Sequence, residues 1–248
     1  MIELKNICKT FEGLEVLKDL NLTINTGESM VTIGRSGCGK TILLKHIIGL
    51  MRPDAGSVLI EGADITKSTS KELNKIRKNF GMLFQGSALF DSLSVFENVG
   101  FQLIEYTNKG FEEIFQHVSD KLRMVGLENI EAVKPAALSG GMKKRVALAR
   151  AICMDPKIIL FDEPTTGVDP IMGDAINELI RSLHDKLRVT SVTVTHDMKS
   201  AYKIADRIAM LYDKHIIEVG TPDEIRNSSN SIVQQFITGN AKGPITKK

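Results

Sequence analysis

The stretch S-M-V-T-I-G-R-S-G-C-G-K-T, residues 29–41, decides the fold of this chain. A strand over 29–33 runs into a glycine-rich loop, and a helix is predicted to follow. Glycines let backbone N–H groups close around phosphate oxygens, and the helix N-terminus adds partial positive charge. We therefore predict a phosphate-binding loop in which Lys40 reaches the β and γ phosphates and the Thr41 hydroxyl binds Mg²⁺. The loop consists of Gly34, Arg35, Ser36, Gly37, Cys38, Gly39, Lys40 and Thr41.

The segment I-I-L-F-D-E, residues 158–163, joins an uninterrupted apolar strand to two carboxylates. Such a run is typical of a central parallel strand that is covered on both faces. Asp162, at the carboxyl end of the strand, is placed to hold the water shell of the metal ion. Glu163 is placed to orient and deprotonate a water that attacks the γ-phosphate. Together with the phosphate loop, this pair predicts nucleotide hydrolysis.

Two further polar residues stand at the ends of predicted strands. Gln85 follows the strand over 79–84, where an amide can touch both the metal and the attacking water. His196 follows the strand over 190–195, where an imidazole can hydrogen-bond the γ-phosphate. A lone residue of either type is usually structural, but the order of these two among the other motifs favours a role in the site.

A second glycine-rich helix start lies at L-S-G-G-M, residues 138–142. Ser139 is a residue type that caps helices, and Gly140 and Gly141 expose the first amides of the following helix. The helix dipole makes this start a second anion site. The helical insertion separates this helix start from the phosphate loop of the same chain. One γ-phosphate is therefore not expected to bind both of them within a single chain. Two copies that face each other head to tail would complete the site.

The periodicity predicts a parallel α/β nucleotide-binding core that is interrupted by a helical insertion. From about Gly86 to Asp155 the pattern is helical, and strand–helix alternation returns from Lys157. The predicted strands are 2–8, 16–24, 29–33, 57–60, 79–84, 158–162, 190–195 and 208–212. The predicted helices are 41–51, 95–106, 111–125 and 139–154.

The composition excludes several classes of protein. The net charge is +2, and no basic block is long enough to track a nucleic-acid backbone, so we expect no nucleic-acid partner. The basic runs Lys143-Lys144-Arg145 and Lys247-Lys248 are expected to be solvated faces. Three cysteines without metal-binding spacing suit a reducing compartment. No apolar run approaches the ~20 residues that span a bilayer, so we expect a membrane role only through a partner.

Taken together, these residues resemble the ATPase subunit of ABC transporters over nearly the whole chain. The family's motifs correspond to Walker A at 34–41, the Q-loop at Gln85, the signature at 138–141, Walker B at 158–162, the D-loop at 167–169 and the switch at His196. The resemblance implies ATP and Mg²⁺ as ligands. It also implies that Phe11 stacks on adenine, that Asp169 lies at the nucleotide, and that Ser139 and Gly141 hold the ATP bound to a second copy.

The resemblance further implies a RecA-like P-loop NTPase core with an N-terminal antiparallel β subdomain and an inserted α-helical subdomain. We expect one ABC ATPase domain over 1–248. Its core would comprise 1–85 and 156–227, its helical subdomain 86–155 and its C-terminal tail 228–248. None of the expected catalytic positions is substituted, which disfavours a scaffold that does not hydrolyse ATP.

A narrower resemblance links the chain to the ATPases of the Mla (maintenance of lipid asymmetry) group. It rests on the stretch 81–99, on Met142 after the signature, and on 235–237 and 243–245 in the tail. It implies phospholipid transport between membranes, with an integral membrane permease, an MCE lipid-binding protein and a small regulatory subunit as partners. It places the chain at the cytoplasmic face of the inner membrane, bound through the permease.

Alternative hypotheses remain at this point. The same fold could serve an importer of a small polar solute such as an amino acid, or an ABC ATPase acting on nucleic acid or ribosomes. The aromatic residues after Gln85 could simply pack the helical insertion. The apolar patch in the tail at 232–237 could dock on a partner or fold back on its own core.

Overall fold

The computed structural model describes residues 1–246, which fall into two compact units. The first unit is Met1–Leu73 together with the chain from Val192 onward, and the second unit is Asn74–Ser191. The run Lys247-Lys248, and with it the end of the predicted tail, lies outside the described residues. The domain boundaries expected after residues 85 and 155 stay a prediction.

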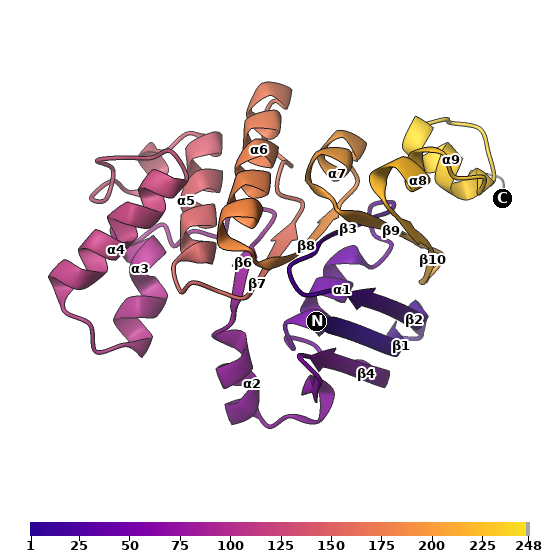
Figure 1. Ribbon diagram of the computed structural model, residues 1–248, viewed down its shortest axis with the longest axis horizontal. Helices are drawn as coiled ribbons and strands as arrows, with labels where there is room; N and C mark the ends of the chain where they lie inside the picture. The colour runs from indigo at the N-terminus through magenta and orange to yellow at the C-terminus, as the bar shows by residue number, and fades with distance from the viewer. Residues whose placement is uncertain (247–248) are drawn as a thin grey trace. The chain divides into compact units, whose positions relative to one another are not determined.

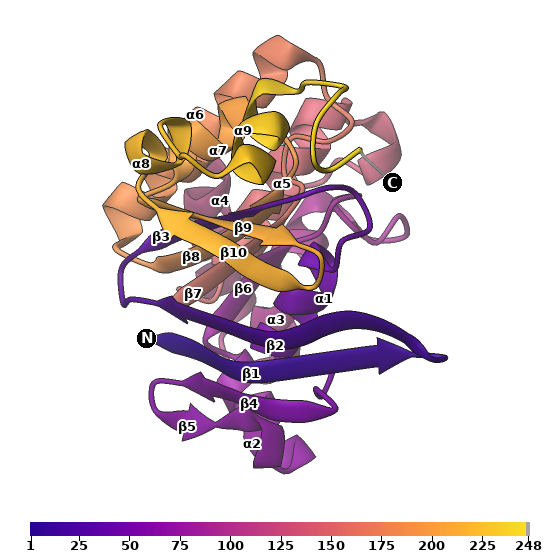
Figure 2. The ribbon, with the colours of Figure 1, turned by 90° about the vertical axis from the view of Figure 1, so that its right-hand side faces the viewer.

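An antiparallel sheet opens the first unit, as expected. It contains β1 (Ile2–Phe11), β2 (Leu14–Ile24), β4 (Ala55–Ile60) and β5 (Ala63–Asp64) in the order β2-β1-β4-β5. Figure 2 shows β1 lying between β2 and β4, and β1 pairs antiparallel with both of them. Ile2, Leu4 and Ile7 on β1 are buried, so the sheet has one face on the core.

The phosphate loop of the first unit leaves a buried parallel strand. All five residues of β3 (Ser29–Ile33) are buried, and β3 pairs parallel with β9 (Arg207–Tyr212). The antiparallel partner of β9 is β10 (His215–Gly220), which contacts β2, and Lys18 N–H of β2 donates to the carbonyl of Lys214 in the turn before β10 at 3.1 Å. Also in this unit are α1 (Lys40–Ile47), α7 (Met198–Ile204), α8 (Pro222–Arg226) and α9 (Ser231–Thr238), while β8 (Thr190–Thr195) runs from the second unit into the first.

The described tail folds back on itself around one glutamine. Val233 and Gln235 of α9 are buried, and α9 contacts α8. The Gln235 amide donates to the Asn240 carbonyl at 3.0 Å and to the Thr246 hydroxyl at 3.1 Å, and its oxygen accepts from Ile245 N–H at 2.7 Å. The structure therefore agrees with the fold-back interpretation of the tail for the part it describes.

The second unit combines a pair of parallel strands with a group of helices. β6 (Phe80–Leu83) pairs parallel with β7 (Ile158–Asp162), and Leu83 lies opposite Phe161. The predicted insertion helices appear as α3 (Val95–Tyr106), α4 (Phe111–Met124) and α5 (Gly140–Ile152), which contact one another and form one group in Figure 1. α6 (Pro170–Leu187) follows β7, and α2 (Ser70–Arg77) crosses the boundary between the units. The mixed α/β class is confirmed.

Within residues 1–246, no helix combines the length and the apolar character that crossing a bilayer requires.

All three cysteines are free, and burial raises the pKa of the Cys153 thiol to about 12. That thiol is therefore protonated and unreactive at neutral pH.

One buried histidine makes the stability of the first unit depend on pH. His46 on α1 is 1% exposed, and its Nδ1 lies 2.9 Å from the Met51 carbonyl, which can only accept a hydrogen bond. Nδ1 therefore carries the proton, and the buried Nε2 has no hydrogen-bond partner among the described residues. Burial is the main cause that lowers the pKa of His46 below 6.5, and Lys9 adds to it against the opposing effects of Met51 and Asp54.

We expect acid to destabilise the protein through this residue. Because the folded-state pKa lies below 6.5, the unfolded chain binds more protons in the window just below that pH. The contribution of His46 to the free energy of unfolding is fully present above that pH window and is lost as the pH falls through it. Urea unfolding at pH 7.5 and 5.5 should show a smaller loss of midpoint in His46→Gln than in the unsubstituted protein. Equal losses in the two proteins would contradict this assignment.

Candidate active site

The phosphate loop closes on its own lysine. The loop leaves β3 at Gly34 and enters α1 at Lys40, which is 5% exposed. The Lys40 ammonium donates to the carbonyls of Gly34 at 2.8 Å and Arg35 at 3.0 Å. A side chain at Gly34 would place its Cβ 2.5 Å from the Leu211 carbonyl oxygen. The close approach of β9 therefore fixes glycine at the start of the loop.

An open hollow of about 310 Å³ lies beside this loop. It is lined by Arg35, Ser36, Gly37 and Cys38 and by Leu211, Tyr212 and Asp213 at the end of β9. Parallel pairing of β3 with β9 brings the carboxyl ends of both strands to the same edge. The sequence analysis did not find residues 211–213 as part of the site, although the strand it predicted over 208–212 includes the first two of them.

Two more predicted site residues lie in the first unit. Phe11 ends β1 and is 36% exposed, and the Lys9 ammonium lies 5.4 Å from its ring centroid. The ring is thus accessible for stacking, with a cation nearby. His196 follows β8 and is exposed, directly before Asp197, which caps α7.

The two carboxylates end the buried strand of the second unit. Asp162 is 6% exposed and Glu163 is 9% exposed. Glu163 has a φ of 47°, in the left-handed region that a residue with a side chain enters at a cost of about 1–2 kcal/mol. Its carboxylate accepts a long bond of 3.4 Å from the Thr166 hydroxyl. Backbone strain of this kind is typical of functional sites, where the surrounding structure maintains it.

The signature segment starts α5 as predicted. The Ser139 hydroxyl accepts from Met142 N–H at 3.2 Å, and Ser139 and Gly140 are exposed. Gly141 is buried against α6, because a Cβ there would lie 2.7 Å from the Met172 sulfur. Asp169 caps α6, and its carboxylate accepts from Ile171 and Met172 N–H, each at 3.0 Å. The caps of α5 and α6 thus hold the signature and the D-loop in a defined arrangement within the second unit.

The irregular segment between β6 and α3 is held by side chains that the sequence analysis missed. Asn98 of α3 is fully buried, and its amide donates to the carbonyls of Phe90, Leu93 and Ser94 while its oxygen accepts from Phe90 N–H. Arg150 of α5 donates to the Ala88 carbonyl at 2.7 Å and to the Ser87 carbonyl at 2.6 Å. Gln85, at the start of the segment, is exposed.

One sequence prediction about charge is wrong. Lys144, in the run expected to be a solvated face, is 4% exposed, and its ammonium donates to the Gln85 carbonyl. The run is amphipathic in its helix, because Lys144 is buried against the segment that follows β6 while Lys143 and Arg145 lie partly in solvent. No sequence signal separated Lys144 from Lys143, since both are lysines in the same helical turn.

These features define a class of protein. A glycine-rich phosphate loop opens a helix in one unit, and a pair of buried carboxylates ends a parallel strand in the other, which is the machinery of a P-loop nucleotide hydrolase.

Comparison with known proteins gives the family. The family described as ABC transporter matches residues 17–166. The intermembrane phospholipid transport ATP-binding protein MlaF of Haemophilus influenzae is 43% identical over 100% of this chain and 94% of its own length. The MlaF protein of Escherichia coli is 37% identical over 99% and 91%. A probable ribonucleotide transport ATP-binding protein of Mycobacterium leprae is 42% identical over 98% and 70%.

Solved structures agree with this result. A dimeric ATP-binding cassette in a post-hydrolysis state with ADP and Pi matches with a TM-score of 0.82 and 35% identity, over 90% of this chain and 99% of that one. A subunit of an ABC transporter complex from Clostridium perfringens matches with a TM-score of 0.84 and 29% identity, over 92% and 90%. The chain belongs to the ABC transporter family, and it is an ATP-binding and ATP-hydrolysing subunit of that family.

The close approach at Gly34 gives a prediction for stability. Gly34→Ala should lower the free energy of unfolding by about 1–3 kcal/mol, because the new methyl group overlaps the Leu211 carbonyl. It should also weaken ATP binding, measured with a fluorescent ATP analogue, because the loop must shift. Gly86→Ala is the control, since no atom lies within 4 Å of its added Cβ. Equal unfolding free energies for the two variants would contradict the prediction.

Proposed function

We propose that this chain hydrolyses ATP to drive phospholipid transport between membranes, as one half of an ATPase dimer bound to an integral membrane permease. The observation that carries the lipid assignment is the match over the full length of both proteins to a relative named for intermembrane phospholipid transport. The relative named for ribonucleotide transport is longer, and this chain covers 70% of it. An importer of a small polar solute such as an amino acid is not favoured.

The residues of both units fit the chemistry of ATP hydrolysis. Lys40 binds the β and γ phosphates, and Phe11 stacks on adenine. Glu163 accepts a proton from the attacking water. The oxygen of that water bonds to the γ-phosphorus, and the bond between the γ-phosphorus and the ADP oxygen breaks, which yields ADP and Pi. His196 hydrogen-bonds the γ-phosphate. The strained backbone of Glu163 and its burial support the role of a fixed base.

The donor set also fits Mg²⁺. Thr41, Gln85 and Asp162 offer a hydroxyl, an amide oxygen and a carboxylate, which are the oxygen donors this cation prefers. Among residues 1–246, no group of three or more His, Cys, Asp or Glu side chains could hold a metal by itself. A site with one or two protein carboxylates plus substrate phosphates needs no such group. When bound, Mg²⁺ would neutralise the charge that develops on the phosphates.

A second copy of the chain is the proposed partner for the signature. Ser139 and Gly140 are exposed at the start of a helix of thirteen residues, where the unsatisfied N–H groups and the helix dipole attract an anion. We assign Ser139, Gly140 and Gly141 to the ATP on the opposite copy. The dimeric cassettes among the structural relatives support this arrangement.

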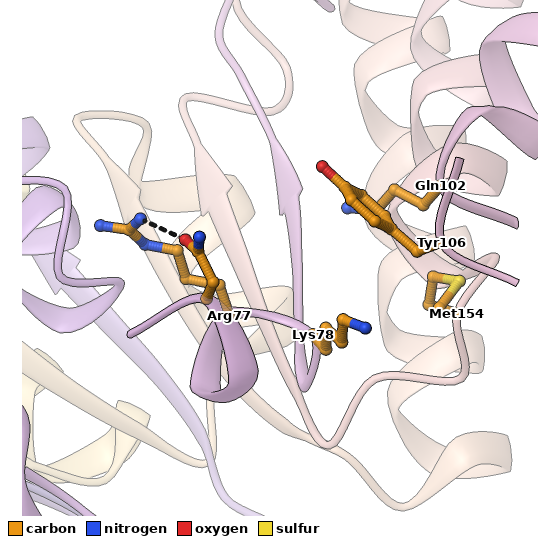
Figure 3. A pocket seen from close by; sticks show the side chains of 6 residues that line it. Arg77, Lys78, Gln102, Tyr106 and Met154 are labelled. Carbon is orange, nitrogen blue, oxygen red and sulfur yellow. Dashed lines mark hydrogen bonds between the residues drawn. The ribbon is translucent and has the colours of Figure 1, made fainter. Parts of the chain in front are cut away.

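The proposed permease site is a hollow of about 250 Å³ in the second unit. It is lined by Asn74, Arg77, Lys78, Gln102, Tyr106 and Met154. Figure 3 shows Gln102 and Tyr106 on one side and Arg77 and Lys78 on the other. Tyr106 is 61% exposed, and the Lys78 ammonium lies 5.4 Å from its ring centroid. The aromatic ring and two cations suit a docking segment with apolar and acidic side chains.

The aromatic residues after Gln85 divide between packing and exposure. Phe90 lies 5.2 Å from Phe101 between ring centroids, and Phe96 lies 5.4 Å from Phe111, so packing explains part of the group. Phe90 is nevertheless 47% exposed, and Phe84, directly before Gln85, is 39% exposed. An MCE lipid-binding protein and a small regulatory subunit complete the proposed assembly, which places the chain at the cytoplasmic face of the inner membrane.

Removal of the proposed base tests the hydrolytic part of this proposal. Glu163→Gln should lower ATP turnover roughly 10²–10⁴-fold, because an amide does not accept the proton. ATP binding should persist, so the variant should accumulate as an ATP-bound dimer, measured by light scattering. The exposed Glu128→Gln should keep full turnover and serves as the control. Unchanged phosphate release in Glu163→Gln would exclude Glu163 as the base.

Isolation of the complex tests the substrate and the docking hollow. The chain purified in complex with its permease should carry phospholipid, identified by mass spectrometry of the extracted complex. Tyr106→Ser should reduce the recovered permease roughly 10-fold or more, because it removes the exposed aromatic ring from the docking hollow, while ATP binding is kept. A bound ribonucleotide or amino acid in place of lipid would contradict the substrate assignment.

A further inference from the structure

Lys144 is a buried cation with a specific partner in the second unit. Its ammonium donates to the backbone carbonyl of Gln85, two residues after β6 ends. Only 4% of Lys144 is exposed. Burial of an ammonium group is costly unless hydrogen bonds and opposite charges compensate for it. The position of this lysine therefore requires an explanation beyond helix formation.

The opposite charges near Lys144 are the two carboxylates of the hydrolytic site. Burial lowers the pKa of Lys144, while the charges of Asp162 and Glu163 act in the opposite direction. The strand register places these groups together, because Leu83 lies opposite Phe161 in the parallel pair of β6 and β7. Gln85 and Asp162 consequently follow neighbouring strand ends at one edge.

Close packing keeps α5 in place on β6. A side chain at Gly81 would place its Cβ 2.0 Å from the Ala151 carbonyl oxygen, so the helix backbone touches the strand directly. Arg150, six residues beyond Lys144 on α5, donates to the carbonyls of Ser87 and Ala88. Ser87 and Ala88 have positive φ values of 64° and 47°, a conformation that is maintained by its surroundings. Two cations of one helix thus fix the backbone of one irregular segment.

We propose that Lys144 is a positioning residue for ATP hydrolysis: it fixes the Gln85 backbone beside the carboxylate end of β7 and links both to the signature helix. The proposal rests on the proposed roles of Gln85 and Glu163. Any shift of α5 transmits through this ammonium to the strand ends that carry the reacting groups. The lysine itself does not touch the substrate.

The test separates positioning from binding and from stability. In the full-length chain, Lys144→Met should lower kcat roughly 10–100-fold, the loss typical of a small misplacement of reacting groups. KM for ATP should stay within about 2-fold, since the phosphate loop lies in the other unit. Lys144→Arg should recover most of the turnover, because a guanidinium group can donate to the same carbonyl.

Lys121→Met is the matched control. Lys121 is also a buried lysine of the second unit, 7% exposed, but its partner is Asp155, away from the carboxylate strand end. This variant should lose stability and keep the turnover of the folded protein. If Lys144→Met does not fold, Lys144→Gln, which keeps an amide donor, should fold and show an intermediate kcat.

The outcomes expected for the Lys144 variants differ from those expected for Glu163→Gln. A folded Lys144→Met or Lys144→Gln with full kcat, or a rise in KM alone, would overturn the positioning role even if Glu163→Gln is inactive. An equal loss of kcat in Lys121→Met would do the same, because it would show a general effect of removing a buried lysine. Full turnover in Glu163→Gln would instead refute the proposed function on which the inference rests.

Discussion

Backbone carbonyls that lie outside any helix or strand must still find donors, and this constraint shapes the second unit. The chain between β6 and α3 forms no helix or strand, and its own backbone hydrogen bonds include Ser87 N–H to the Phe84 carbonyl and Leu93 N–H to the Phe90 carbonyl. Side chains of two helices supply further donors: Asn98 from α3, and Lys144 and Arg150 from α5. The segment is therefore irregular in its backbone and fixed in its position. That combination lets Gln85 and the residues after it stand at a strand end as defined groups.

A similar solution holds the phosphate loop of the first unit. Lys40 donates to two carbonyls of the loop that it follows, and these bonds fix the backbone of the loop. Gly34 allows the backbone of β9 to approach to a distance at which no side chain fits. Groups that are ordered in advance lose little freedom when a ligand binds, and this lowers the cost of stabilising charge in a transition state.

The backbone of Glu163 has an unfavourable conformation that fixes the position of its carboxylate. Glu163 keeps a left-handed backbone at the end of a strand whose five residues are all buried. Rigid packing of β7 maintains that conformation, because relaxing it would disturb the core around Phe161. The buried Lys144 carries the opposite charge, and the charges of Asp162 and Glu163 act on it. The hydrolytic groups thus depend on packing and on charge together.

Much of this architecture could be predicted from the sequence because it follows from local rules. The spacing of glycines and lysine identified the loop over 34–41, the apolar run identified β7, and the capping type of Ser139 identified the start of α5. These signals lie within a few residues of each other, and periodicity reports them directly. The order of the family motifs then assigned Gln85, Glu163 and His196 to one proposed site.

Only the tertiary structure decided which of several residues of the same type is buried and hydrogen-bonded. Lys143 and Lys144 are adjacent residues of the same type, yet only the second of them is buried, and its ammonium donates to the Gln85 carbonyl. Asn98 looks like any polar residue of an amphipathic helix until its amide is seen to bond three carbonyls. Residues 211–213 join the phosphate loop only through the pairing of strands that are far apart in the chain. The sequence by itself determined the loop, the carboxylate strand and the signature helix, because each depends on neighbouring residues. Burial and long-range hydrogen bonds depend on the packing of distant segments, and for that reason the structure alone could assign them.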